Sequence, residues 1–256
     1  MNQTDPNLEE MARQLRLAGW GVQPPQQYLS DMDDAFLQAW NISKPFTMIS
    51  PERGWALTEA LRYCHANSIP GDIVECGVWK GGACLLASLI LQNCESQEME
   101  ASPRDIWLYD TFEGMTEPGE EDCIAVSGEA VSNRNPKGWW AAGESLVRQT
   151  LSASPLNQER FHLVAGPVES TLDLCVPERI ALLRLDTDWY ASTAKELEIL
   201  YPRLSPGGIL IIDDYGHFSG ARKAVDEYFA LRGESPLLHR SDYTGRVLVK
   251  PWNTRS

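Results

Sequence analysis

Short apolar runs alternate with amphipathic stretches from about residue 70 onward. Each apolar run has the length of a buried strand and ends in a polar or glycine-rich segment. The stretches between them repeat apolar residues at helical spacing, as at Leu197, Leu200 and Leu204 after the candidate N-cap Ser192. This alternation is typical of βαβ units and predicts an α/β fold with a mainly parallel sheet. The predicted strands are Asp72–Cys76, Ile106–Asp110, Phe161–Ala165, Ile180–Asp186 and Ile209–Asp213.

Residues 1–66 show a different pattern, of helices without intervening strands. The last of these helices has Ser50 as its expected N-cap and Pro51 at its first position. We therefore expect an N-terminal helical prefix over 1–66, packed on the sheet and covering the site, and a main domain over 67–256. The helical repeats of the prefix are Leu8, Met11 and Leu15, then Phe36 and Trp40, then Leu57, Leu61 and Cys64.

Two later segments depart from the βαβ pattern. The apolar stretches 237–239 and 247–249 flank a short polar turn and predict an antiparallel hairpin that closes the sheet. The segment at about 114–142 is long, acidic and rich in proline and glycine, and it directly follows a strand end. A loop of that length in a compact domain is either functional or disordered. Because Trp139 and Trp140 offer contact surfaces, we favour a substrate lid.

The charge of the chain limits its partners. The net charge is −14 over 256 residues, which argues against nucleic acid or an anionic membrane and favours a neutral or cationic small molecule. No window approaches the roughly 20 apolar residues of a membrane span. Residues 1–5 lack the basic and apolar regions of a secretory signal, so we expect a cytoplasmic protein. The six cysteines form no C-x-x-C motif, which leaves a zinc site unsupported.

The first motif with chemical content is the stretch 72–83, where a strand runs through glycines into an apolar helix. Gly77 permits a close approach of the backbone to a ligand, and Gly81 and Gly82 free the start of the helix. The spacing is not G-x-G-x-x-G, so a dinucleotide site is disfavoured. Glu75, just before the turn, suits a ligand that carries an ammonium group, such as S-adenosylmethionine. An ordinary βα turn without a ligand remains the alternative.

The second motif places Asp110 at the end of the next strand, before Thr111 and Phe112. In nucleoside-binding sheets an acidic residue at this point accepts hydrogen bonds from both ribose hydroxyls. A solvated aspartate at a strand end is the alternative.

The third motif is a set of carboxylates after two consecutive strands. Asp186 ends one strand, and Asp213 and Asp214 end the next, so the three converge at the carboxyl edge of the sheet. Arg184 is the only basic residue close in sequence, and the carboxylates would repel one another unless a further cation neutralised them. Ligands that are all oxygen suit Mg²⁺. His217 follows in a glycine-flanked loop and is either a general base or a surface residue.

Together these motifs resemble the macrocin O-methyltransferase family, which includes sugar-hydroxyl methyltransferases of macrolide pathways and related aminocoumarin enzymes. The resemblance covers roughly residues 45–250. It rests on four ordered patterns: E-C-G-V-x-x-G, D-[ST]-F-x-G, D-x-D-x-Y-x-S-T and D-D-Y. These are met at Glu75–Gly81, Asp110–Gly114, Asp186–Thr193 and Asp213–Tyr215.

The resemblance implies a Rossmann-like S-adenosylmethionine methyltransferase fold, with a mainly parallel seven-stranded sheet and a C-terminal antiparallel hairpin. It implies Mg²⁺ on Asp186, Asp213 and Asp214, similar to the metal site of catechol O-methyltransferases. Asp186 would be both metal ligand and general base, with His217 in reserve. The implied cofactor-binding residues are Thr47, Met48, Glu75, Gly77, Val78, Trp79, Gly81, Ala83, Asp110 and Asp186.

By this resemblance the acceptor is a deoxysugar hydroxyl of a glycosylated antibiotic or similar natural product, with a phenol as the next choice. The helical prefix is a candidate interface for self-association. Thr187 stands where the family commonly has glycine, and the lid at 114–142 matches no family pattern, which leaves the acceptor open.

Two other functions compete with this hypothesis. Asp186-Thr187-Asp188 is a D-x-D, which metal-dependent glycosyltransferases use to hold a nucleotide sugar, but this reading leaves Glu75–Gly82 unexplained. A non-catalytic methyltransferase-like scaffold is the second alternative. The presence of all three candidate metal carboxylates argues against it.

Overall fold

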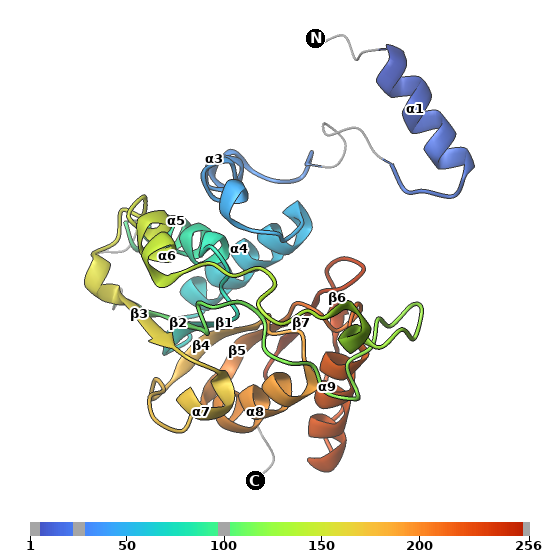
Figure 1. The fold of residues 1–256 in the computed structure, drawn as a ribbon. Coiled ribbons are helices and arrows are strands. Elements are labelled where there is room, and N and C mark those ends of the chain that lie inside the picture. Colours follow the sequence, from blue (N-terminus) through green and yellow to red (C-terminus); the bar gives the residue numbers. More distant parts are fainter. Residues whose placement is uncertain (1–5, 23–28, 97–102, 253–256) are drawn as a thin grey trace.

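The computed structural model describes residues 6–22, 29–96 and 103–252. The expectation about a signal at residues 1–5 lies outside them. In the described part, one sheet has the strand order β3-β2-β1-β4-β5-β7-β6 (Figure 1). Strands β1 to β5 are parallel, whereas β7 runs antiparallel to β5 and to β6. The strands are β1 (Asp72–Cys76), β2 (Ile106–Asp110), β3 (Phe161–Ala165), β4 (Ile180–Leu185), β5 (Leu204–Ile212), β6 (His239–Arg240) and β7 (Arg246–Val249). The predicted fold class, a mainly parallel seven-stranded sheet with a terminal hairpin, is confirmed.

Strand β5 begins at Leu204, earlier than the predicted Ile209. Its pairing with β4 shifts between Ile180, opposite Leu204, and Leu182, opposite Ile209. The extra residues include Gly207, whose φ is 76°. A glycine in this conformation reads as a turn in the sequence, and here it belongs to an irregularity inside the strand.

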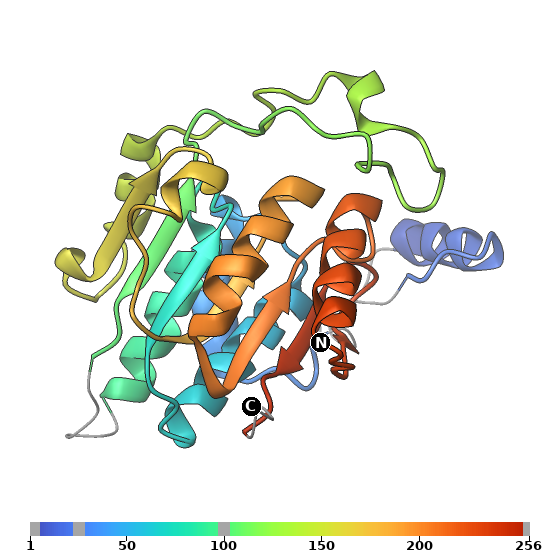
Figure 2. The same ribbon diagram turned by 90° about the horizontal axis from the view of Figure 1, so that it is seen from below.

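Two groups of helices cover the two faces of the sheet (Figure 2). Alternate strand residues serve different faces: Ile73 packs with α3 to α6, and Val74 packs with α7 to α9. Short 3₁₀ turns connect the elements: η1 (Lys44–Phe46), η2 (Val131–Arg134), η3 (Gln158–Arg160) and η4 (Tyr201–Arg203). The helices are α1 (Pro6–Leu17), α3 (Asp34–Ser43), α4 (Pro51–Ala66), α5 (Gly82–Glu95), α6 (Glu144–Leu151), α7 (Val168–Thr171), α8 (Tyr190–Leu200) and α9 (Ser219–Leu231).

The predicted start of α4 is confirmed. The Ser50 hydroxyl accepts a hydrogen bond from the backbone N–H of Arg53 at 3.2 Å, and Pro51 is the first helical residue. This cap fixes where the helix begins and therefore where Arg53, in its first turn, reaches the edge of the sheet.

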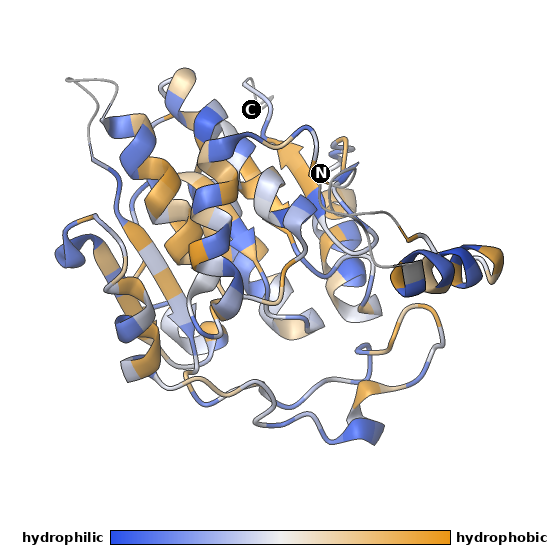
Figure 3. Ribbon diagram, turned by 90° about the horizontal axis from the view of Figure 1, so that it is seen from above, coloured by the Kyte–Doolittle hydropathy of each residue, from blue (hydrophilic) through white to orange (hydrophobic). Residues whose placement is uncertain are grey.

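Helix α1 does not pack on the sheet, so that part of the expectation for the prefix is wrong. It stands away from the other helices, and Leu8 and Met11 are 58% and 59% exposed (Figure 1). Most of its surface is hydrophilic, whereas apolar residues concentrate in the strands and in the inward faces of the other helices (Figure 3). The apolar stripe of α1 is therefore left largely exposed.

The segment between β2 and α6 runs as a long irregular strap along the side of the molecule where the parallel strands end (Figure 2). We call residues 114–142 the lid, as in the sequence analysis. Its Ile124 pairs with Phe218 in an isolated β-bridge, and both side chains are buried with Trp189. The lid is therefore attached to the start of α9. None of the helices in the described ranges could span a membrane, and cytoplasmic location stays a prediction.

Candidate active site

A cavity of about 270 Å³ lies at the carboxyl ends of β1, β2, β4 and β5, and its far wall comes from the lid. Gly81 is the one predicted site residue that does not line it, because Gly81 packs against Val147 of α6 instead. The predicted residues that line the cavity are Thr47, Met48, Glu75, Gly77, Val78, Trp79, Ala83, Asp110, Asp186, Asp213, Asp214 and His217.

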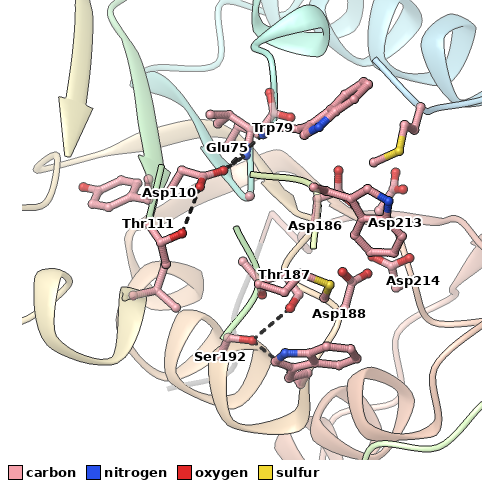
Figure 4. Close-up of a pocket in the computed structure, with 18 of the residues that line it drawn as sticks. Glu75, Trp79, Asp110, Thr111, Asp186, Thr187, Asp188, Ser192, Asp213 and Asp214 are labelled. Carbon is pink, nitrogen blue, oxygen red and sulfur yellow. Dashed lines mark hydrogen bonds between the residues drawn. The ribbon is translucent and has the colours of Figure 1, made fainter. Parts of the chain in front are cut away.

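The glycine turn after β1 is held by Asp110 at the end of β2. One carboxylate oxygen of Asp110 accepts from the backbone N–H groups of Val78 (2.7 Å) and Trp79 (3.1 Å). The other oxygen accepts from the N–H of Phe112 at 2.8 Å. Asp110 therefore shapes the turn, and its carboxylate also faces the cavity across from the aspartates of β4 and β5 (Figure 4).

The chain before α4 packs against the start of α5. A Cβ on Gly82 would collide with the backbone of Phe46 and would lie 2.7 Å from the backbone nitrogen of Thr47. This close approach, which only glycine permits, brings Thr47 and Met48 to the cavity beside the glycine turn. Thr47 and Met48 thus line the same cavity as the glycine turn, and their contact with the cofactor stays a prediction.

Glu75 is 5% exposed and does not stand free. It receives a hydrogen bond from the Cys84 thiol at 2.8 Å and an ion pair from Arg184 at 2.5 Å. Burial raises the pKa of Glu75, and the Arg184 guanidinium opposes that rise. The carboxyl that the sequence assigns to a ligand's ammonium group is thus already held by a cation within the chain.

Arg184 connects several carboxylates of the site through ion pairs. It is 2% exposed and also pairs with Asp186 at 2.8 Å and with Asp213 at 2.6 Å. The second oxygen of Asp213 pairs with Arg53 from α4. Asp213, one of the three predicted metal ligands, is therefore bound by two guanidinium groups. Arg53 was not predicted as a site residue, because no motif near it in the sequence indicates a site.

A second cluster of carboxylates lies beside this network. Ligand oxygens of Asp186, Asp188 and Asp214 lie within 4.8 Å of one another, and Oδ2 of Asp214 is buried without a hydrogen-bond partner. Burial and the neighbouring carboxylates raise the pKa of Asp186 to about 7, and burial raises the pKa of Asp188 to about 8. Figure 4 shows these side chains gathered on one side of the pocket with Asp213 next to them. Asp188 was not among the predicted metal ligands, yet it belongs to this cluster of three carboxylates. The D-x-D pattern at Asp186–Asp188 was the sequence signal that could have indicated it.

His217 lines the cavity from the loop after β5. One ring nitrogen, Nδ1, lies 3.1 Å from the Tyr243 hydroxyl, and the ring packs edge-on against Phe218. Burial, together with the positive charges of Arg134 and Arg53, lowers the pKa of His217. The neutral form is therefore favoured at pH 7, as proton abstraction requires.

The lid supplies both the expected tryptophans and two residues, Met115 and Thr116, that the sequence analysis did not indicate. Met115, Thr116, Trp139 and Trp140 line the cavity, and the two indole rings meet edge to face at 5.8 Å. Trp189, at the start of α8, donates from Nε1 to the carbonyl of Thr116 at 3.2 Å. The lid thus forms the wall of the cavity opposite the glycine turn. It carries the aromatic surface that the sequence led us to expect.

A parallel sheet with this strand order, closed by an antiparallel β7 and carrying its cavity at the carboxyl ends of the central strands, defines a Rossmann-like methyltransferase. The chain belongs to the macrocin O-methyltransferase family, whose model matches residues 21–250. The resemblance seen in the sequence is confirmed, and with it the expectation of an O-methyltransferase.

Characterised relatives and a solved structure agree with this assignment. The chain is 35% identical over 184 residues to the demethyldecarbamoylnovobiocin O-methyltransferase of Streptomyces niveus, covering 72% of this chain and 68% of that protein. It is 36% identical over 189 residues to the 8-demethyl-8-(2,3-dimethoxy-alpha-L-rhamnosyl)-tetracenomycin-C 4'-O-methyltransferase of Streptomyces olivaceus, covering 72% and 69%. The structure of the O-methyltransferase NovP is 33% identical and has a TM-score of 0.70, covering 80% of this chain and 82% of that one.

Proposed function

We propose that the protein transfers a methyl group from S-adenosylmethionine to a hydroxyl of a glycosylated natural product, with a sugar hydroxyl as the foremost acceptor, and that it requires a divalent cation such as Mg²⁺. The observation that carries this proposal is the contact between two sites in one cavity. The glycine turn at Gly77 lies against the backbone of Asp186, the residue that begins the acidic cluster.

The cofactor would occupy the part of the cavity between the glycine turn and Asp110. Gly77, Val78 and Trp79 offer a backbone surface without bulky obstruction, and Thr47 and Met48 close it from the prefix. When bound, S-adenosylmethionine supplies an electrophilic methyl on a sulfonium. The acidic side chain of Asp110, which faces the cavity, suits a cationic ligand and supports that choice, whereas Glu75 is already paired with Arg184.

The acidic residues fit a divalent cation. All donors are carboxylate oxygens, as Mg²⁺ prefers, and a bound cation would give Oδ2 of Asp214 the partner that it lacks within the described residues. The cation would be held by Asp186 and Asp214, with Asp213 as the third ligand by resemblance or Asp188 by proximity. A bound divalent cation lowers the pKa of a coordinated hydroxyl and orients it.

The remaining steps fall to the protein. Asp186 is the proposed general base, since it lies between the cofactor turn and the acidic cluster, and His217 is the reserve. Arg184 holds Asp186 at 2.8 Å and so fixes its direction. Trp139 and Trp140 would cover the acceptor and exclude water. Holding the reacting groups in line accounts for roughly 7–11 kcal/mol of the barrier in well-oriented reactions.

The choice of acceptor rests on the relatives. One is named for a demethylated novobiocin derivative and another for a rhamnosyl group of tetracenomycin C. The neutral aromatic faces of Trp139 and Trp140 suit the apolar faces of a sugar or of an aromatic aglycone. Neither the glycosyltransferase hypothesis nor the scaffold hypothesis gains a supporting observation.

The test is transfer of labelled methyl from S-adenosylmethionine to a panel of glycosylated and phenolic acceptors, with Mg²⁺ and with excess EDTA. We expect transfer to glycosylated acceptors that EDTA abolishes. Asp186→Asn should lose turnover while binding the cofactor in calorimetry. Asp173→Asn, an exposed site paired with Lys195, is the control. Full activity in EDTA or in Asp186→Asn would contradict the metal-and-base mechanism, and cofactor binding without any transfer would favour the scaffold.

The third metal ligand is decided by a second measurement. Mn²⁺ affinity is compared by calorimetry in Asp188→Asn and Asp213→Asn. The variant that loses more affinity identifies the ligand. If Asp213 is the ligand, the cation must share its carboxylate oxygens with the two guanidinium groups.

A further inference from the structure

A carboxyl group that the mechanism does not use lies beneath the active site. Glu196, in the second turn of α8, is 0% exposed. Its Oε1 accepts from the Thr187 hydroxyl at 2.9 Å, whereas Oε2 is buried without a hydrogen-bond partner. Its other polar neighbour is the buried Cys76 thiol, and no lysine or arginine in the described ranges forms an ion pair with it.

The position of Glu196 connects the two halves of the site. Cys76 is the last residue of β1, directly before the glycine turn, and its carbonyl accepts from the backbone N–H of Asp186 at 2.9 Å. Thr187 stands between Asp186 and Asp188 in the acidic cluster. Its methyl group lies at 3.3 Å from where a Cβ on Gly77 would be. A single buried side chain thus touches the end of β1 and the turn that carries the proposed metal ligands.

The turn contains a residue in an uncommon backbone conformation. Asp188 has a φ of 67°, in the left-handed region, which aspartate tolerates better than most residues other than glycine. The Thr187 hydroxyl bonds to Glu196, and the Thr187 backbone carbonyl has two further partners. It accepts from the backbone N–H of Trp189 at 2.8 Å and from the Ser192 hydroxyl at 3.4 Å. The hydrogen bond to Glu196 is the one that fixes the side chain of Thr187.

Stability alone does not explain a glutamate here. A buried carboxyl with one unsatisfied oxygen costs free energy, and an apolar residue of similar volume would avoid that cost. Groups that break a packing rule in this way tend to occur where function requires them. Burial raises the pKa of Glu196 well above its usual value.

We propose that Glu196 is a positioning residue, which through Thr187 holds the Asp186–Asp188 turn in the geometry that binds the cation and the acceptor. This inference rests on the proposed function, because it concerns the same metal site. In metal sites generally, residues that orient the ligands contribute about 10–100-fold to metal affinity or activity. We expect an effect of that size from Glu196.

The test compares Glu196→Met, Glu196→Gln and the control Glu198→Met, an exposed site on the same helix. Mn²⁺ and S-adenosylmethionine affinities are measured by calorimetry, with kcat, KM and the melting temperature. In Glu196→Met we expect Mn²⁺ affinity and kcat to fall by about 10-fold or more, with cofactor affinity and melting temperature maintained. Glu196→Gln, which still accepts from Thr187, should restore both.

A merely structural role predicts the opposite pattern, a lower melting temperature with unchanged Mn²⁺ affinity in Glu196→Met. That result would overturn the proposal, as would equal losses in the Gln and Met variants. If Glu196→Met does not fold, Thr187→Val removes the same hydrogen bond from the other side, and wild-type Mn²⁺ affinity in that variant would also overturn it.

The double variant adds a further check. If Glu196 acts through Thr187, Glu196→Met and Thr187→Val together should lose no more Mn²⁺ affinity than either alone, and additive losses would contradict this route. Failure of the wild type to bind Mn²⁺ or to transfer methyl would refute the proposed function. A fully active wild type with an unaffected Glu196→Met variant would refute the present inference alone.

Discussion

Gly77 and Asp186 lie back to back: a Cβ on Gly77 would overlap the carbonyl oxygen of Asp186. The two residues directly follow the adjacent strands β1 and β4, and the N–H of Asp186 donates to the carbonyl of Cys76 at 2.9 Å. The proposed cofactor turn and the acidic cluster are therefore in backbone contact. A single missing side chain makes that contact possible.

Gly77→Ala should accordingly damage both stability and cofactor binding. The alanine would have to keep a φ of 80° and push Asp186 away. Strain of this kind costs about 1–3 kcal/mol before the overlap is counted. The free energy of unfolding from denaturant titration and the cofactor affinity from calorimetry are the measurements.

The matched control is Gly128→Ala in the lid, where φ is 69° but no atom lies within 4 Å of an added Cβ. It carries the conformational strain without the overlap and should bind the cofactor normally. If both variants behaved alike, the close approach to Asp186 would be irrelevant.

Arg184→Met should be strongly destabilising. The guanidinium is 2% exposed and pairs with Glu75, Asp186 and Asp213, so its loss leaves buried carboxylates without their cation. Breaking a buried pair from one side typically costs about 3–5 kcal/mol. Arg148→Met, which breaks an exposed pair with Glu144, should cost no more than about 1 kcal/mol. Equal unfolding free energies for the two variants would show that the network contributes little.

Asp122→Ala should release the lid. The side chain is 1% exposed and accepts from the backbone N–H of Gly119 at 2.6 Å and of Tyr190 at 2.8 Å, which joins the lid to the start of α8. Loss of these two hydrogen bonds weakens the attachment of the lid, at about 0.5–1.5 kcal/mol for each bond. We expect faster amide hydrogen exchange across the lid and a higher KM for the acceptor, with cofactor affinity unchanged. Unchanged exchange in the lid would contradict the role of Asp122 as its anchor.

His217 should make stability depend on pH. Because burial and nearby arginines lower its pKa in the folded protein, the unfolded chain binds more protons at acidic pH. The contribution of His217 is therefore present above its unfolded pKa of about 6.5 and is lost as the pH falls below it. The difference in unfolding free energy between wild type and His217→Asn should shrink as the pH is lowered from 7.5 to about 5. A constant difference would refute the lowered pKa.

The strands were predictable because alternate apolar residues serve two helical layers, and β1, β2 and β3 begin and end at the predicted residues. Strand β5 was misjudged at its start, because glycine and proline there mark an irregularity rather than a turn. Helix α1 has the periodicity of a packed helix, yet its apolar residues are left largely exposed.

At the site, residue identity at strand ends predicted which carboxylates meet, since parallel strands share one edge. Their partners were not predictable. Arg53 reaches Asp213 from a helix far away in sequence, and this changes which aspartates are free to bind a cation. The lid residues Met115 and Thr116 follow no periodicity, and they are held at the cavity by contacts distant in sequence, such as the hydrogen bond from Trp189 to the Thr116 carbonyl and the attachment of Asp122 to α8.

The division of the cavity between central strands and lid has an evolutionary consequence. The turn after β1 and the acidic ends of β4 and β5 come from the middle of the sheet, where any insertion would disrupt packing on both faces. The lid enters from outside and is fastened at a few points, so its length and sequence can change while the sheet stays intact. On the proposed function, exchange of this one loop would change the acceptor, and a graft of residues 114–142 from a relative tests whether it alters the regiochemistry.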